Sequence, residues 1–404
     1  MAPSHRRRLA LLGFHVDGGR SRPPALVTVA AAAAADTSSP WATATEDSRC
    51  IKVETELLQA TIVKNNPKHW MTGVEKHSFV DKATCFHEVG DGLMVIDWLM
   101  EGGSDEKWQG DFDRQSGIAL DGSGQPAAQG TDRYLWHDAS WVRGTVGKDD
   151  TDRAWGARMA HGTSHRKRAV EGPQLCHRMP PVQPTIIKGE DFIAVETRYD
   201  YAFAAPGRAA GSKWRQLVVF PHGKRYFLLM DEIISANASP ELFLRNDTPG
   251  CVRHVKGDSF SEMYLSHLGA ADSPYGLTIP SSEFFEPFPP DLKFNYRRDM
   301  HACPEHFIRG YHLRDTGTGA PGPWLAGITL QPSVVHEAWA SQRPGDIIVM
   351  IEEVHGRPTQ VGEKFSAAHA VGFFDSVQEM HEVAARYHGC TVLTADPVRG
   401  WGLS

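Results

Sequence analysis

The densest group of chemically useful side chains lies between residues 244 and 269, in the sequence LRNDTPGCVRHVKGDSFSEMYLSHLG. β-Elimination on a uronic acid needs a base for the C5 proton, groups that neutralise the carboxylate, and an acid for the leaving oxygen. We therefore predict that His254 is the base and Tyr264 is the acid. The predicted carboxylate neutralisers are Asn246, Arg253 and Lys256. A strand, a loop and a strand with ordinary surface charges would contain the same residue types, so that interpretation stays open.

A second polar stretch, FNYRRDMHACPEHFIRGYHLRD, covers residues 294–315. Its alternation predicts a strand whose polar face carries Arg309 and Tyr311. Because the guanidinium fork matches a carboxylate, these residues are predicted to bind an anionic sugar. The alternative is an exposed strand with ordinary ion pairs.

A third stretch, RYLWHDASW at residues 133–141, combines aromatic and polar side chains in a region without periodic apolar positions. Trp136 and Trp141 could stack on sugar rings while His137 bonds to hydroxyl groups. We predict a sugar-binding subsite here, with a small hydrophobic cluster under a loop as the alternative.

Hydrolysis of a glycosidic bond is the alternative chemistry, and it needs two carboxylates at a fixed separation. The sequence spacing selects no pair from the candidates, which are Asp97, Glu101, Asp231, Glu232, Glu337, Glu352 and Glu353. His69, His77 and His87 are close in sequence but lack the fixed spacing of a metal site. We predict no metal and no other cofactor. A glycan-binding protein without catalysis, using Trp136 and Trp141, is the third hypothesis.

Composition limits the other function classes. The chain has 404 residues, with 42 Lys and Arg against 49 Asp and Glu, and a net charge of −7. This balance argues against nucleic acid as a partner, and no apolar run is long enough for a membrane span. Residues 1–45 resemble a secretory leader, with a disordered start as the alternative. A leader implies a secreted or periplasmic protein, and its absence implies a cytoplasmic one; the oligomeric state is not predicted.

Most of the remaining chain reads as strands. Alternating or apolar runs predict strands or hairpins at 50–66, 92–100, 191–203, 214–234 and 324–356. The region 102–172 lacks such runs and predicts long loops. One helix is predicted to start at Ser376, where Glu379 three residues later completes a capping box, and to end near Gly389. Residues 46–404 are therefore predicted to form one large all-β domain with a C-terminal helix.

His369 lies in the strand-like sequence KFSAAHAVGFF, on the same face as Phe365, Val371 and Phe373. An unpaired imidazole inside an apolar core is costly, so this histidine needs a partner from another strand. We predict a hydrogen-bonded core histidine and leave it out of the catalytic set.

Two stretches, TQVGEKFSAAHAVGFFDS and CIKVETELLQATIVKNN, resemble the closing strands and the opening hairpin of galactose-mutarotase-like β-supersandwich proteins. The resemblance implies a large antiparallel β-sandwich and a carbohydrate ligand. No active-site motif of that family can be matched to residues of this chain. Taken with the polar stretches, it favours a carbohydrate-active enzyme, with a polysaccharide lyase ahead of a glycoside hydrolase and a polysaccharide or oligosaccharide as substrate.

Overall fold

The computed structural model describes residues 41–64, 72–75, 77–87, 90–95, 99–102, 167–171, 182–201, 204, 207–254, 259–269, 276–284, 294–343 and 347–404. The predicted leader and most of the predicted loop region 102–172 lie outside these ranges. The first described strand, at 42–46, begins before the predicted domain boundary at residue 46. Within these ranges, no helix has the length and apolar character needed to cross a membrane.

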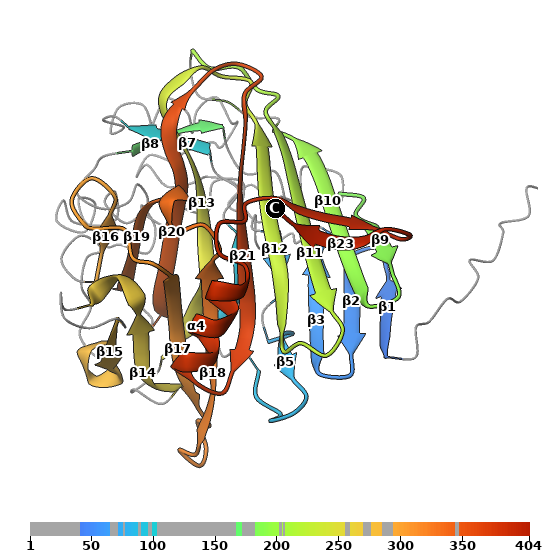
Figure 1. Cartoon of the computed structure of the whole chain (residues 1–404), viewed down its shortest axis with the longest axis vertical. Coiled ribbons are helices and arrows are strands. Elements are labelled where there is room, and N and C mark those ends of the chain that lie inside the picture. The colour runs from blue at the N-terminus through green and yellow to red at the C-terminus, as the bar shows by residue number, and fades with distance from the viewer. Residues whose placement is uncertain are drawn as a thin grey trace, which may run out of the picture. The chain divides into compact units, whose positions relative to one another are not determined.

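Within the described residues, twelve strands form one antiparallel sheet (Figure 1). Strand β5 (Val80–Asp81) pairs with β3, and β8 (Lys167–Glu171) pairs with β7 (Leu99–Gly102), which in turn pairs with β13. The main path of this sheet runs β1 (Ala42–Glu46), β2 (Cys50–Thr55), β3 (Leu58–Val63), β4 (Thr72–Val74), β6 (Gly90–Val95), β13 (Ser239–Arg253), β20 (Ile347–Thr359), β19 (Val335–Arg343) and β16 (Tyr296–Arg297).

A second antiparallel sheet contains nine of the described strands. Short 3₁₀ turns occur at Ser266–Leu268, Ser281–Phe284 and Pro332–Val334. The strand order in the nine-stranded sheet is β15 (Leu277–Pro280), β14 (Phe260–Leu265), β17 (Phe307–Arg314), β18 (Pro321–Thr329), β21 (Lys364–Phe374), β12 (Tyr226–Ile234), β11 (Lys213–Pro221), β10 (Phe192–Asp200) and β9 (Thr185–Lys188).

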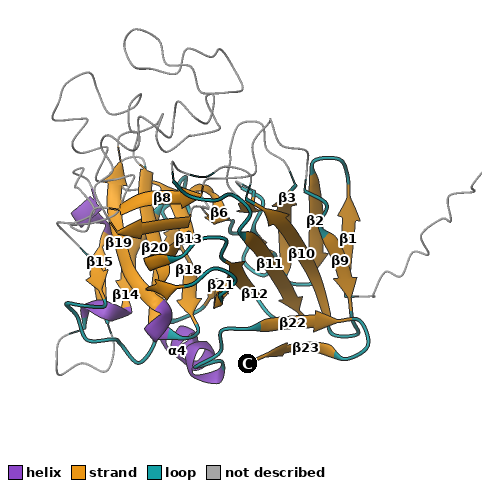
Figure 2. Ribbon diagram, turned by 90° about the horizontal axis from the view of Figure 1, so that it is seen from above, coloured by secondary structure: helices purple, strands orange, loops and turns teal. Residues whose placement is uncertain are grey.

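The two sheets pack face to face because alternate residues of their strands are apolar. Val218 and Leu229 of the nine-stranded sheet share one core with Ile51 and Met350 of the twelve-stranded sheet. The opposite face of the nine-stranded sheet packs against helix α4 (Val377–Arg386) and the hairpin of β22 (Leu393–Asp396) and β23 (Gly400–Leu403), as Figure 2 shows. The predicted all-β sandwich with a C-terminal helix is confirmed, and the hairpin after the helix was not predicted.

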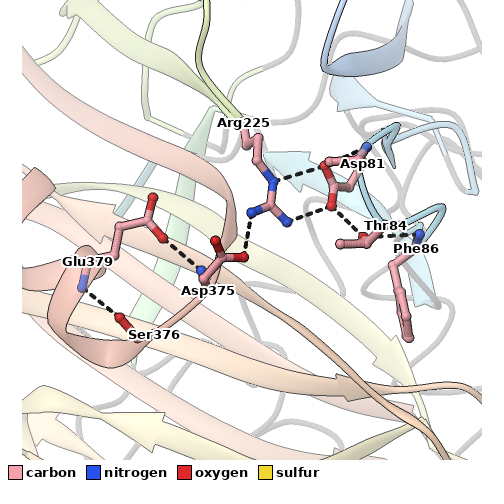
Figure 3. A network of polar contacts seen from close by, with 8 residues as sticks. Asp81, Thr84, Phe86, Arg225, Asp375, Ser376 and Glu379 are labelled. Atoms are coloured by element: carbon pink, nitrogen blue, oxygen red, sulfur yellow. Dashed lines mark hydrogen bonds and ion pairs between the residues drawn. The ribbon is translucent and has the colours of Figure 1, made fainter.

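The start of α4 is fixed by its own side chains and by a contact with the N-terminal strands (Figure 3). The Ser376 hydroxyl accepts a hydrogen bond from the Glu379 N–H at 3.1 Å, and the Glu379 carboxylate accepts one from the Asp375 N–H at 2.7 Å. Arg225, after β11, donates to Asp375 at 2.5 Å and to both oxygens of Asp81 at 3.0 and 2.6 Å. This arginine therefore joins β5 to the beginning of the helix.

Candidate functional site

Four charged residues form one row across neighbouring strands of the twelve-stranded sheet. Arg245 on β13 lies opposite Glu353 on β20, Glu353 lies opposite Glu337 on β19, and Glu337 lies opposite Arg297 on β16. These four strands lie side by side in Figure 1. We call these residues the charge row.

The charge row lies on the face that points away from the nine-stranded sheet. Neighbours of its members along the chain, including Leu244 and Ala338, belong to apolar clusters between the sheets. Because successive strand residues point to opposite faces, Arg245 and Glu337 must point outward. All four members of the row are nevertheless buried, with Glu337 and Glu353 at 0% exposure.

Each carboxylate of the charge row has an arginine at its outer side. Arg245 donates from Nη2 to Glu353 Oε1 at 2.9 Å and from Nε to the same oxygen at 3.3 Å. Arg297 Nε lies 3.4 Å from Glu337 Oε1, while its guanidinium also donates to Asp299 at 2.8 and 3.2 Å. The order of side chains across the four strands is therefore arginine, glutamate, glutamate, arginine.

The two central carboxylates are an unfavourable arrangement for a merely structural sheet. Residues directly opposite one another on antiparallel strands have Cβ atoms about 4.5–5.5 Å apart, and like charges in this position destabilise the pair. Violations of local rules of this kind are expected at functional sites. Glu337 and Glu353 are therefore the first candidates for chemistry among the described residues.

Aromatic side chains surround the charge row on the same face. Trp339 follows Glu337 by two residues on β19, and the guanidinium carbon of Arg245 lies 5.5 Å from its ring centre. Phe243 precedes Arg245 by two residues, and its ring lies 4.4 Å from the His336 imidazole. Ligand-binding sites are typically lined by apolar and aromatic side chains with a few precisely placed polar groups.

A second polar group lies directly beneath the charge row, between the two sheets. Glu352 points inward and accepts hydrogen bonds from Arg309 Nη2 and the Thr329 hydroxyl, both at 2.9 Å, while His369 Nε2 lies 3.3 Å away. Burial alone would raise the pKa of Glu352, but the charge of Arg309 and the contacts with His369 and Thr329 hold it below its usual value. His369 is fully buried and has a partner from another strand, as predicted.

Asp231 on β12 extends this inner polar group. Its Oδ1 accepts hydrogen bonds from Trp214 Nε1 at 2.9 Å and from Gln216 Nε2 at 3.1 Å. Burial raises the pKa of Asp231 to about 6, although the charge of His369 and the two hydrogen bonds act in the opposite direction. The carboxylate is therefore less stable inside the sandwich than it would be in water.

The residues predicted as base and acid do not meet in the structure. His254 is buried at the end of β13, with its Nδ1 2.9 Å from the Ser259 hydroxyl and its ring stacked on Phe260 at 4.0 Å. Phe260 belongs to the core between the sheets. Tyr264 belongs to the apolar cluster under α4, on the opposite face of the nine-stranded sheet. One substrate cannot contact both side chains through this sheet.

The predicted carbohydrate-binding residues are likewise dispersed. Asn246 lies opposite Glu352, on the inward face of β13. Arg309 also points inward, and Tyr311 donates from its hydroxyl to the Gly250 carbonyl at 3.2 Å inside the core. The structure thus uses Arg309 and Tyr311 in the core rather than on an exposed polar face. Only the backbone of Arg253 is described, and outside the described residues lie Lys256, Trp136, His137 and Trp141.

No protein-family model matches the chain, and its sequence matches no curated protein. Solved structures that it resembles include the galactosidase domain of an α-galactosidase–sucrose kinase, at 10% identity and a TM-score of 0.42, over 82% of this chain and 42% of that chain. An α-mannosidase from Enterococcus faecalis matches at 8% identity and a TM-score of 0.38, over 86% and 31% of the two chains. This chain thus spans less than half the length of either protein.

A galactose mutarotase-like protein from Clostridium acetobutylicum matches at 9% identity and a TM-score of 0.39, over 83% of this chain and 99% of that chain. Galactose mutarotase-like proteins are therefore among the structures that this chain resembles, as the sequence predicted.

Proposed function

We propose that the chain is a carbohydrate-active enzyme that hydrolyses a glycosidic bond with Glu337 and Glu353. The observation that carries this proposal is the charge row, in which register places two carboxylates opposite one another between two arginines. Retaining glycosidases use two carboxyl groups about 5–5.5 Å apart, and the Cβ separation of directly opposed residues on antiparallel strands falls in a similar range. The proposal therefore includes retention of configuration at the anomeric carbon.

The contacts of the two carboxylates suggest their roles. Glu353 accepts two hydrogen bonds from Arg245, which favours the charged form and suits a nucleophile. Glu337 would then protonate the leaving oxygen while Glu353 bonds to the anomeric carbon. In the second step, Glu337 takes a proton from water, the resulting hydroxyl bonds to the anomeric carbon, and Glu353 leaves. Trp339, on the same face, would hold the sugar ring.

Hydrolysis takes the place of elimination as the first hypothesis for a geometric reason. Elimination by His254 and Tyr264 needs both side chains at one substrate, but they belong to opposite faces of the nine-stranded sheet. Glu337 and Glu353 lie on the same face of one sheet, so one substrate can contact both.

The test is incubation of the full chain with a panel of neutral and uronic-acid polysaccharides, with reducing ends and ultraviolet absorbance recorded together. The proposal predicts reducing ends without the absorbance of an unsaturated product. Absorbance would instead indicate elimination, and binding without either product would indicate a binding protein; both results would overturn the proposal.

Variants then assign the roles. Glu337→Gln should lower kcat by about 10²–10⁴-fold, the usual contribution of a general acid or base. Glu353→Ala should lose activity and regain part of it with azide, a small nucleophile that can occupy the space of the missing carboxylate. Glu190→Gln, at an exposed position, is the matched control. Urea unfolding of each variant shows whether activity is lost because the catalytic group is missing or because the protein is unfolded. If the two glutamates were purely structural, their substitution would lower stability and azide would restore no activity.

A further inference from the structure

Three histidines and a tyrosine gather where α4 meets the outer face of the nine-stranded sheet, so both sheets separate them from the charge row. Tyr264 lies on β14, His306 immediately precedes β17, His381 lies in α4, and His388 follows the end of the helix. Helix α4 contacts β17 and β18, and Figure 1 shows it lying across them. The fold thus brings side chains from three parts of the chain together at one place: β14, the start of β17, and α4 with the residues that follow it.

These side chains form a continuous chain of polar contacts. The Tyr264 hydroxyl accepts a hydrogen bond from the Gly276 N–H at 3.0 Å and lies 2.7 Å from His381 Nε2. On the other side of the same ring, His381 Nδ1 lies 2.9 Å from His306 Nδ1. Two neutral imidazoles at this distance share one proton between their Nδ1 atoms, whichever ring carries it. The shared proton occupies a position between two nitrogen lone-pair sites.

We infer that this histidine group is a binding site for a divalent transition-metal ion such as Zn²⁺, with His306 and His381 as ligands through Nδ1 and His388 as a third ligand. The metal would take the place of the proton between the two rings. The proton would then move to the Nε2 atom of His306, so that both imidazoles remain neutral.

The distances suit this assignment. Zn–N bonds are about 2.0–2.1 Å, so two nitrogens in a tetrahedral site lie about 3.4 Å apart and their ring centres about 5 Å apart. The His306 and His381 ring centres are 5.1 Å apart, and those of His306 and His388 are 6.0 Å apart. A small opening of the Nδ1 pair, and rotation of the exposed His388 side chain, would complete the group. In the described parts of the chain, no three potential ligands already surround a common point.

The surroundings of His381 support a ligand role. A metal-binding histidine usually donates its second ring N–H to an oxygen, which fixes the tautomer and the ring orientation. The buried Tyr264 hydroxyl is in position to accept that hydrogen bond, and Gly276 holds the hydroxyl in place. His306 and His381 are thus placed as a pair of ligands, and Tyr264 is placed as the hydrogen-bond acceptor of one of them.

The experiment uses the full chain without a histidine tag, stripped with a chelator. Zn²⁺ binding is measured by calorimetry, and Co²⁺ binding is followed by its visible absorption. We expect one ion per chain and at least tenfold weaker binding for His306→Gln and for His381→Gln. Tyr264→Phe should weaken binding by about 10–100-fold, as is usual for loss of a hydrogen bond to a ligating histidine. His222→Gln, at an exposed position remote in sequence, should bind as the unmodified chain does.

A second measurement distinguishes loss of a metal ligand from misfolding of the variant. His388 is exposed, so His388→Gln should leave the melting temperature without metal unchanged, while it reduces the rise that Zn²⁺ produces in the unmodified chain. Absence of saturable binding would overturn the inference. Binding that survives both His306→Gln and His381→Gln would also overturn it, because the contacts would then only fasten α4 to the sheet.

Discussion

Replacement of Asp231 by Asn should stabilise the protein at neutral pH. Asp231 is buried in the sandwich, and burial raises its pKa from 3.8 to about 6. The folded chain therefore binds the carboxyl proton more tightly than the unfolded chain does. The stability associated with that proton is fully present below pH 3.8 and is lost as the pH rises through 6. Asn cannot ionise and does not carry this loss.

The size of the effect follows from the two pKa values. The difference between 3.8 and about 6 corresponds to about 3 kcal/mol of unfolding free energy at pH values above 6. An Asn oxygen can keep both hydrogen bonds, from Trp214 and Gln216, but its new NH₂ group needs a partner in the core. An unsatisfied buried donor costs about 1–3 kcal/mol, so the net gain at pH 7.5 should be about 0–2 kcal/mol. This cost does not vary with pH. The difference in unfolding free energy between Asp231→Asn and the unmodified chain should therefore grow by about 1.4 kcal/mol between pH 5 and 7.5.

The assay is urea unfolding of both chains at pH 5, 6 and 7.5, since other carboxyl groups titrate equally in both and cancel. Asp200→Asn, at an exposed position, controls for the general loss of one negative charge. A difference between Asp231→Asn and the unmodified chain that stays constant across this pH range would refute the reasoning. The carboxylate would then be stabilised in the core by His369 as well as it is in water.

Two further predictions concern stability. Arg309→Met leaves Glu352 buried without its arginine, and should lower the free energy of unfolding, measured in urea, by about 3–5 kcal/mol. The double variant Arg309→Met/Glu352→Leu should recover much of that loss, and equal losses in both variants would contradict this prediction. Ser376→Ala removes the acceptor for the Glu379 N–H and should cost about 1 kcal/mol, with faster hydrogen exchange confined to α4; unchanged exchange at the start of the helix would contradict it.

Local patterns were enough to predict most of the fold. Alternation located β2 and β3, the hairpin of β11 and β12, and β21, because each of these strands buries one face of period-two side chains. The Ser376 cap located α4 because capping depends on residues three positions apart. The alternation at 307–312 correctly predicted β17, but Arg309 and Tyr311 point into the core between the sheets. Polar residues on one face of a strand indicate exposure to water only when no buried partner, such as Glu352 for Arg309, exists elsewhere in the chain.

The candidate site depends on register, which one strand's sequence does not contain. Glu352 and Glu353 are adjacent and identical in type, yet one bonds to Arg309 between the sheets and the other to Arg245 on the outward face. A shift of β20 by one residue would exchange them, and would put Glu352 opposite Glu337 and Glu353 in the core. The inner contacts of Glu352 with Arg309, Thr329 and His369 oppose that shift, because only these partners compensate for burying a carboxylate there. The core histidine His369 therefore helps to set which glutamate faces the charge row, although it lies on the other side of the sheet.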